Sequence, residues 1–232
     1  DLGGAVAGGD EGSAGPAELA AQEIRKAGGR AVSNSDSVSD RKGVAHMIQN
    51  AMDEFKGLHA VINPAGILRD TMFHKMSDAD WDMVVNVHLN GAYNVTRQTI
   101  NHFREQGEGS YVLFTSTSGL IGNFGQTNYG AAKLSLVGFM NSLKLEGAKD
   151  NIKVNAVCPV AATRMTQALM PPAVLEMLKP EVVSPAVAYL ASDDAPTGMI
   201  LTAAAGAFAA AQIVETDGVN LGQNASADDI AA

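Results

Sequence analysis

Cysteine is almost absent from this sequence of 232 residues, which contains only Cys158. One thiol excludes an internal disulfide, and the five histidines show no metal-ligand spacing with it, so we expect no zinc site. Such cysteine usage fits a reducing compartment, and we expect a cytoplasmic protein. Basic residues are also few, 16 against 25 acidic ones, and the net charge of -9 argues against nucleic acid as a partner.

Long hydrophobic runs are scarce as well. Residues 195–214 carry no charge and would be long enough to cross a bilayer, but they are rich in alanine and glycine and include Pro196 and Gln212. We expect a buried strand with its flanking turn here, and no membrane partner. With 46% apolar and 18% charged residues the chain can build a sizeable core. We expect residues 1–232 to form one domain, with a flexible tail over 223–232.

Helical and strand-like segments alternate along the chain. Such alternation is typical of a parallel, doubly wound α/β sheet with helices on both faces, and ligands of such sheets bind beyond the carboxyl ends of the strands. The predicted helices cover residues 16–27, 39–55, 77–104, 128–149, 165–178 and 184–192, and the predicted strands cover 30–35, 58–63, 110–116, 152–158 and 213–215.

Three residues near the middle of the chain form a reactive group. Tyr129 and Lys133 are four residues apart, which places both side chains on one face of a helix. An ammonium beside a phenol favours the phenolate, so the tyrosine can exchange protons, and the hydroxyl of Ser116 can hold a carbonyl oxygen. A Tyr/Lys pair alone is more often a surface pair. The fixed spacing from Ser116 favours proton transfer at a carbonyl or carbinol carbon.

The pattern Ser116-x12-Tyr129-x3-Lys133 is preceded by the turn Asn63-Pro64-Ala65-Gly66 and followed by Pro159. Together these motifs resemble the short-chain dehydrogenase/reductase family, with its Rossmann-like fold. The likeness is narrower for the (3R)-hydroxyacyl-CoA dehydrogenase unit of type 2 peroxisomal multifunctional enzymes and its bacterial single-domain relatives. The narrower likeness is carried by the segments 66–70, 87–89, 122–129, 164–166 and 204–208.

The resemblance implies a role for each catalytic residue. Tyr129 would be the acid/base, Lys133 would lower its pKa and hold the nicotinamide ribose, and Ser116 would bind the substrate oxygen. His88 stands where most of the family has an asparagine that relays protons through a water molecule. A buried histidine satisfied by backbone carbonyls is the alternative for His88.

The resemblance also implies a site for NAD. Asn63, Ala65 and Gly66 would line its adenosine side, although Pro64 lacks the backbone N–H of the usual turn. Asp1 resembles the acid that binds the ribose hydroxyls and repels a 2′-phosphate, which favours NAD over NADP. The remaining cofactor contacts would be Asp36 and Ser37 at the adenine, Pro159 and Thr163 at the nicotinamide, and Tyr129 and Lys133 from the catalytic group.

The family's glycine-rich phosphate loop is missing from the sequence. The opening glycines, residues 3–15, include Asp10 and Glu11 and contain no Gly-x-Gly-x-x-Gly, so we expect a flexible surface loop there. The family's first strand has no counterpart either. We therefore expect about forty further residues upstream in the native polypeptide, one strand–helix–strand unit.

Three functions stay open. The first is NAD-dependent interconversion of a secondary alcohol and a ketone, with 3-hydroxyacyl-CoA and 3-oxoacyl-CoA as substrates. The second is hydroxysteroid oxidation, because the apolar flap 165–178, with Met165, Met170 and Met177, suits either kind of small molecule. The third is a non-catalytic scaffold that does not bind nucleotide. The resemblance further implies a homotetramer or homodimer, built through residues 81–104 and 128–149 and the last strand.

Overall fold

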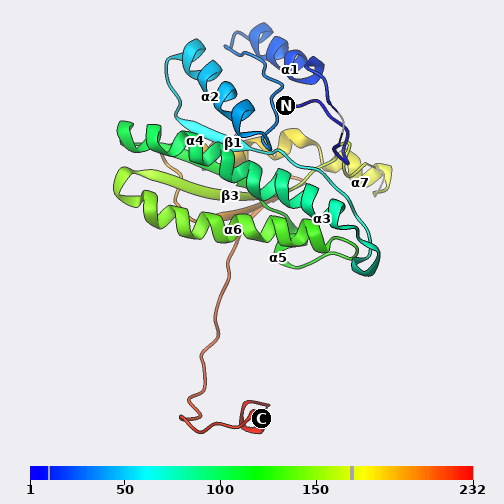
Figure 1. The fold of residues 1–232 in the computed structure, drawn as a ribbon, viewed down its shortest axis with the longest axis vertical. Helices are drawn as coiled ribbons and strands as arrows, with labels where there is room; N and C mark the ends of the chain where they lie inside the picture. Colours follow the sequence, from blue (N-terminus) through cyan, green and yellow to red (C-terminus); the bar gives the residue numbers. More distant parts are fainter. Residues whose placement is uncertain (10, 168–169, 232) are drawn as a thin grey trace.

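One five-stranded sheet organises the computed structural model, which describes residues 1–9, 11–167 and 170–231 (Figure 1). The strands follow the order of the sequence, and the first four are parallel. The fifth strand runs antiparallel to the fourth. The strands are β1 (Ala60–Asn63), β2 (Gly109–Phe114), β3 (Ile152–Val160), β4 (Ile200–Ala204) and β5 (Ala207–Ala211).

Helices cover both faces of the sheet. On one face lie α2 (Arg41–Phe55), α4 (Gly91–Gln106) and α6 (Thr127–Gly147), and on the other α8 (Ser184–Ala191). Side chains of β2 alternate between these layers: Tyr111 and Leu113 join the core under α4 and α6, whereas Val112 packs with α8. The predicted three-layer, doubly wound α/β fold is therefore confirmed, with one antiparallel edge strand added.

Local chemistry explains where the helices begin and end. The Asp40 carboxylate accepts hydrogen bonds from the first backbone N–H groups of α2, and Ser77 caps α3 (Asp78–Val85) in the same way. Gly107 ends α4 with a φ of 77°, a conformation that favours glycine. The other helices are α1 (Gly15–Lys26), α5 (Thr117–Leu120), α7 (Pro172–Met177) and α9 (Ala227–Ala231), with short 3-10 turns at Phe73–Lys75, Ala148–Asp150 and Pro180–Val182.

The helix predicted over residues 77–104 is continuous but not regular. Between α3 and α4 the backbone forms one π-helical turn, η2 (Asn86–Asn90). A π turn widens a helix by one residue and occurs often at functional sites. His88 is buried at the centre of this turn.

Two predicted strands are wrong. Residues 30–35 form no ladder with any described strand. Two of their carbonyls accept local donors instead: Arg25 donates to the Ala31 carbonyl, and the terminal amine of Asp1 donates to the Asn34 carbonyl. Residues 213–215 also lie outside the sheet. The chain turns back earlier instead, at Ala205 and Gly206, whose positive φ values suit a tight hairpin.

The other expected segments are confirmed in part. Residues 195–214 contain the paired strands β4 and β5. Among the described residues, no helix is both long and apolar enough to span a membrane. The flap predicted as a helix over 165–178 is helical only in α7, and its residues 168–169 lie outside the described part of the chain.

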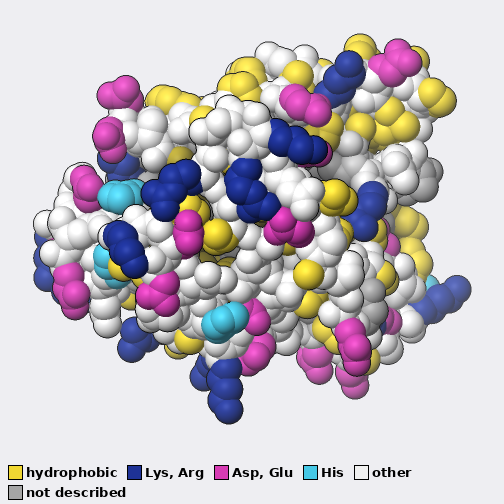
Figure 2. Space-filling view, turned by 90° about the horizontal axis from the view of Figure 1, so that it is seen from above, with side chains coloured by type: hydrophobic (Ala, Val, Ile, Leu, Met, Phe, Trp, Pro, Cys, Tyr) yellow, Lys and Arg dark blue, Asp and Glu magenta, His cyan; other side chains and the backbone are white. Residues whose placement is uncertain are grey.

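The chain leaves the sheet after β5. Figure 1 shows the following segment running away from the helices and ending at α9. The flexibility of residues 223–232 stays a prediction, as does the single domain. Figure 2 shows acidic and basic side chains interspersed on one face of the molecule, without a broad area of one sign.

Candidate active site

The proposed catalytic residues gather where β2 and the helices after it meet the carboxyl edge of the sheet. Ser116 caps α5 just beyond β2, and Tyr129 lies in the first turn of α6. Lys133 follows one turn later, and its Nζ lies 5.5 Å from the centre of the Tyr129 ring. The imidazole of His88 meets the same ring edge-on, with centroids 5.2 Å apart. The structure thus brings together all four residues that the sequence singled out.

The protonation of Tyr129 differs from the expectation. Burial raises the pKa of Tyr129, the neighbouring Ser116 hydroxyl lowers it, and the negative charge of Asp70 raises it further. The lowering of this pKa by Lys133 stays a prediction; in the structure the Lys133 Nζ donates to the Phe114 carbonyl at 2.7 Å and sits over the tyrosine ring. Burial also lowers the pKa of Lys133 to about 7, so its charge is easily lost.

The contacts of His88 fit both of the expected alternatives in part. Its Nε2 lies 2.9 Å from the carbonyl oxygen of Ile67 and 3.1 Å from the backbone nitrogen of the same residue, as in a structural histidine. Its Nδ1, by contrast, is buried and has no hydrogen-bond partner among the described residues. Burial lowers the pKa of His88 to about 3, and the charge of Lys133 contributes to this. The imidazole is therefore neutral at physiological pH and keeps one nitrogen free.

Glycine is required beside His88. A Cβ built on Gly66 would overlap the imidazole ring. In the turn just before Gly66, Pro64 has no backbone N–H to donate. The next residue, Ala65, donates its N–H to the Asn63 side chain at 3.3 Å.

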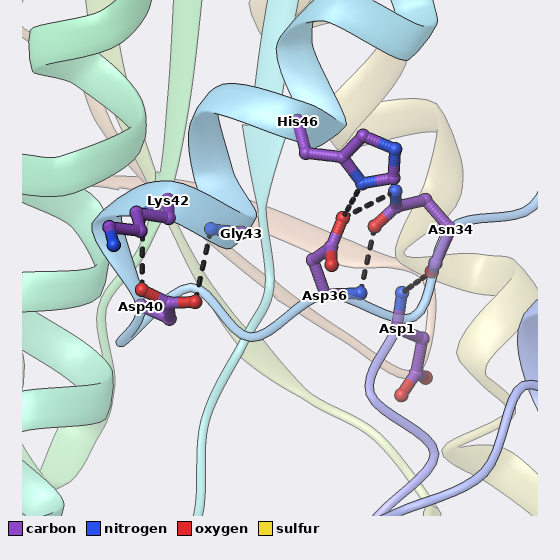
Figure 3. A network of polar contacts seen from close by, with 7 residues as sticks. All are labelled: Asp1, Asn34, Asp36, Asp40, Lys42, Gly43 and His46. Atoms are coloured by element: carbon purple, nitrogen blue, oxygen red, sulfur yellow. Dashed lines mark hydrogen bonds and ion pairs between the residues drawn. The ribbon is translucent and has the colours of Figure 1, made fainter.

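Asp36, one of the two residues expected at the adenine, belongs to a polar group with Asn34, His46 and Asp1, shown in Figure 3. One carboxylate oxygen of Asp36 is 2.7 Å from both Asn34 Nδ2 and His46 Nδ1. These two bonds, that from Asn34 first, lower the pKa of Asp36. The Asp1 amino group donates to the Asn34 carbonyl at 3.0 Å, so Asp1 and Asp36 share a neighbour. Two expected acidic contacts of the adenosine half therefore lie together.

The other expected cofactor residues lie in turns or at the end of β3. The Ser37 hydroxyl accepts a hydrogen bond from the Ser39 backbone N–H, and Thr163 exchanges hydrogen bonds with the segment that follows it. Pro159 does not end its strand as predicted, since it pairs with Ala203 inside β3. The register pairs Asn63 with Leu113 and Phe114 with Val157, which brings the ends of β1, β2 and β3 to one edge.

Comparison with known proteins decides the family. A family model described as short chain dehydrogenase matches residues 3–172, more than half of the chain. This chain belongs to the short-chain dehydrogenases. The expected resemblance is confirmed.

Individual relatives show which members of the family this dehydrogenase is similar to. A short-chain type dehydrogenase/reductase of Mycobacterium tuberculosis is 53% identical, covering 100% of this chain and 81% of that protein. The peroxisomal multifunctional enzyme A of Dictyostelium discoideum is 44% identical, covering 94% of this chain and 49% of that enzyme. The solved full-length peroxisomal multifunctional enzyme type 2 of Drosophila melanogaster has a TM-score of 0.80 at 33% identity, covering 93% of this chain and 38% of that one. The dehydrogenase thus spans less than half of either multifunctional enzyme.

The opening loop of the dehydrogenase is attached to the site. Most of its residues are exposed or half-buried, as expected of a surface loop. However, Leu68 donates its N–H to the Val6 carbonyl, and Arg69 Nε donates to the Ala7 carbonyl at 2.8 Å. Gly8 packs on the Ile67 side chain. The loop therefore lies along the segment that follows β1.

Sequence reasoning missed a set of polar residues beside Tyr129. Asn128 is fully buried, donates to the carbonyls of Arg69 and Asp80, and accepts the backbone N–H of Tyr129 at 2.8 Å. Gln126 is also buried and bonds to Asp70. The sequence carries a signal for these residues, the high density of amide side chains between Ser116 and Tyr129, but it indicated only the resemblance to the family.

Proposed function

We propose that this dehydrogenase uses NAD to interconvert a secondary alcohol and a ketone, and that its substrates are 3-hydroxyacyl-CoA and 3-oxoacyl-CoA thioesters. The observation that carries the proposal is the meeting of Ser116, Tyr129, Lys133 and a buried His88 at one edge of the sheet. A histidine in this place, together with the similarity to peroxisomal multifunctional enzymes, supports the acyl-CoA branch.

The residues at the adenosine end fit NAD. The second carboxylate oxygen of Asp36 has no hydrogen bond among the described residues and can accept one from an adenine amine. The carboxylate of Asp1 lies near the same end, and two acids there would repel a 2′-phosphate. Asn63, Ala65 and Gly66 would line the path, and Ser37, Pro159 and Thr163 would complete it. NAD bound there supplies the acceptor for the hydride.

The chain's own residues supply the proton chemistry. In oxidation, Tyr129 first releases its own proton, and its phenolate oxygen then takes the proton of the substrate hydroxyl as hydride leaves the carbinol carbon. The Ser116 hydroxyl holds the same substrate oxygen. Lys133, whose pKa of about 7 lets it change charge near neutral pH, is held by the Phe114 carbonyl beside the tyrosine. The free Nδ1 of His88 can bind a water molecule that passes the proton onward. His88 and Lys133 are buried, and Ser116 and Tyr129 are partly buried, so the access of bulk water to these groups is limited.

A substrate screen tests the proposal. The purified protein is mixed with NAD or NADP and with 3-hydroxyacyl-CoA thioesters of several chain lengths, hydroxysteroids or short alcohols, and NADH or NADPH formation is followed. We expect the highest kcat/KM for a 3-hydroxyacyl-CoA with NAD. Preference for a steroid would give the runner-up function. Binding of neither nucleotide would favour the non-catalytic scaffold.

We also propose that the protein assembles into a homodimer or homotetramer. Supporting this, α4 and α6 expose large apolar side chains, Tyr93 on the first and Leu134 and Leu145 on the second. Light scattering during size exclusion tests this, and a monomer at working concentration would contradict it.

A further inference from the structure

A side-chain bond links two segments on either side of the active site. Asp70 follows the turn after β1, and Gln126 immediately precedes α6. Gln126 Nε2 donates to Asp70 Oδ2 at 2.6 Å, across 56 residues of sequence. A backbone bond runs parallel to it, from the Thr71 N–H to the Gly125 carbonyl at 2.9 Å. The two segments are therefore attached at two consecutive positions.

Gln126 continues this link to Ser116. Its Oε1 accepts hydrogen bonds from Ser118 Oγ at 2.7 Å and Asn123 Nδ2 at 2.9 Å. The N–H of Ser118 in turn donates to Ser116 Oγ at 3.1 Å. Because Gln126 is only 7% exposed, losing one of its partners would leave a buried polar group unsatisfied. The chain of bonds from Asp70 thus reaches the hydroxyl that would hold the substrate oxygen.

Gln126 also fixes the start of the helix that carries Tyr129. Its carbonyl accepts the Gly130 N–H at 2.7 Å, in the first turn of α6. Its side chain makes no capping bond to this turn. The side chain is instead directed to Asp70 and to the loop before the helix, so a shift of Gln126 moves the first turn with it.

The charge of Asp70 acts on Tyr129 as well. Asp70 is a carboxylate on the exposed side of the network, and its Coulombic effect raises the pKa of Tyr129. The nearby Lys133 Nζ donates to the Phe114 carbonyl. The bond and the charge come from the same side chain but can be removed separately.

We propose that Asp70 and Gln126 are positioning residues for the active site, because their bond fixes Ser116 and the first turn of α6. The catalytic consequence rests on the proposed function, whereas the tether itself does not. Neither residue needs to contact the substrate.

The charge is tested by Asp70→Asn, which keeps the acceptor for Gln126 and removes the negative charge. Asp82→Asn is the matched control, since Asp82 is an exposed acid on α3. We expect the pH midpoint of oxidation to fall by on the order of half a pH unit in Asp70→Asn and to stay unchanged in the control. Equal midpoints in both variants would overturn the charge effect. If no substrate is turned over, the titration of Tyr129 is read from tyrosinate absorbance, as the difference from Tyr129→Phe.

The tether is tested without activity, by hydrogen–deuterium exchange of residues 123–130. Asp70→Ala and Gln126→Leu should each raise exchange there, whereas Asp70→Asn should keep the wild-type protection. With an active enzyme, Gln126→Leu should lower kcat about tenfold with little change in the pH midpoint. Wild-type protection in both Asp70→Ala and Gln126→Leu would overturn the tether. A failed substrate screen with altered exchange would overturn only the proposed function.

Discussion

The imidazole of His88 and the phenol of Tyr129 lie at 83° to one another, with ring centroids 5.2 Å apart. One residue comes from a π-helical turn and the other from the start of α6. Their contact therefore connects the turn between α3 and α4 to the start of α6. The Nδ1 of the histidine remains available in the part of the chain that the structure describes.

His88 is expected to assist catalysis as a neutral residue. His88→Asn keeps a polar group that can bind water and should retain at least about a tenth of the wild-type kcat, whereas His88→Ala should lose about a hundredfold. Since the pKa of His88 is about 3, neither change should remove a limb from the pH profile of kcat near neutral pH. A limb near neutral pH that disappears in His88→Asn would contradict the neutral role.

Gly66 is expected to tolerate no side chain. Gly66→Ala places a methyl group against the His88 ring and should lower the free energy of unfolding by about 1–3 kcal/mol. Gly138→Ala is the control, because a Cβ at Gly138, inside α6, meets nothing within 4 Å. That change should stabilise the protein by about 0.5–1 kcal/mol. Denaturant unfolding measures both, and a neutral Gly66→Ala would contradict the packing described here.

Lys133 is expected to make stability depend on pH. Burial lowers its pKa from 10.5 to about 7, so the unfolded chain binds more protons between these values. Stability should therefore rise as the pH increases through this window, as far as Lys133 is concerned. Lys133→Met should flatten the rise and raise the melting temperature at neutral pH, while abolishing turnover. An unchanged slope would show that Lys133 is not desolvated in solution.

Asp36 is expected to bind the adenine end of NAD. Asp36→Ala removes the free carboxylate oxygen and should weaken NADH affinity about tenfold, measured by fluorescence titration. Asp53→Ala is the control: Asp53 is an exposed acid in α2, and its carboxylate accepts a hydrogen bond from Gln49. This control should bind NADH like the wild type. Equal affinities for all three proteins would place the adenine elsewhere.

The sequence predicted the elements that local chemistry controls. Asp40 and Ser77 identify helix starts because their side chains cap the first turn, and the spacing of Tyr129 and Lys133 places them on one helix face. The catalytic group was predictable for the same reason. The β5 strand was not, because alanines carry little strand preference and the hairpin depends on pairing with β4.

Properties that depend on contacts between residues far apart in the sequence could not be predicted from the sequence. The π turn around His88 and the bond between Asp70 and Gln126 both need the folded chain. The net direction of the Tyr129 pKa shift was not predicted, because the sequence shows the neighbouring Lys133 but not the burial of the phenol. Spacing in the sequence identified the residues of the candidate site, and packing in the folded chain determined the direction of their pKa shifts.

The most direct test of the account is turnover by Tyr129→Phe, with NADH binding measured on the same preparation. The change removes one oxygen from a partly buried ring, so the fold and the adenine end of the site should be preserved. We expect NADH to bind as tightly as to the wild type, while oxidation of 3-hydroxyacyl-CoA falls by at least about a thousandfold. Turnover at the wild-type rate would contradict the assignment of Tyr129 as the acid/base, and with it the proposed mechanism.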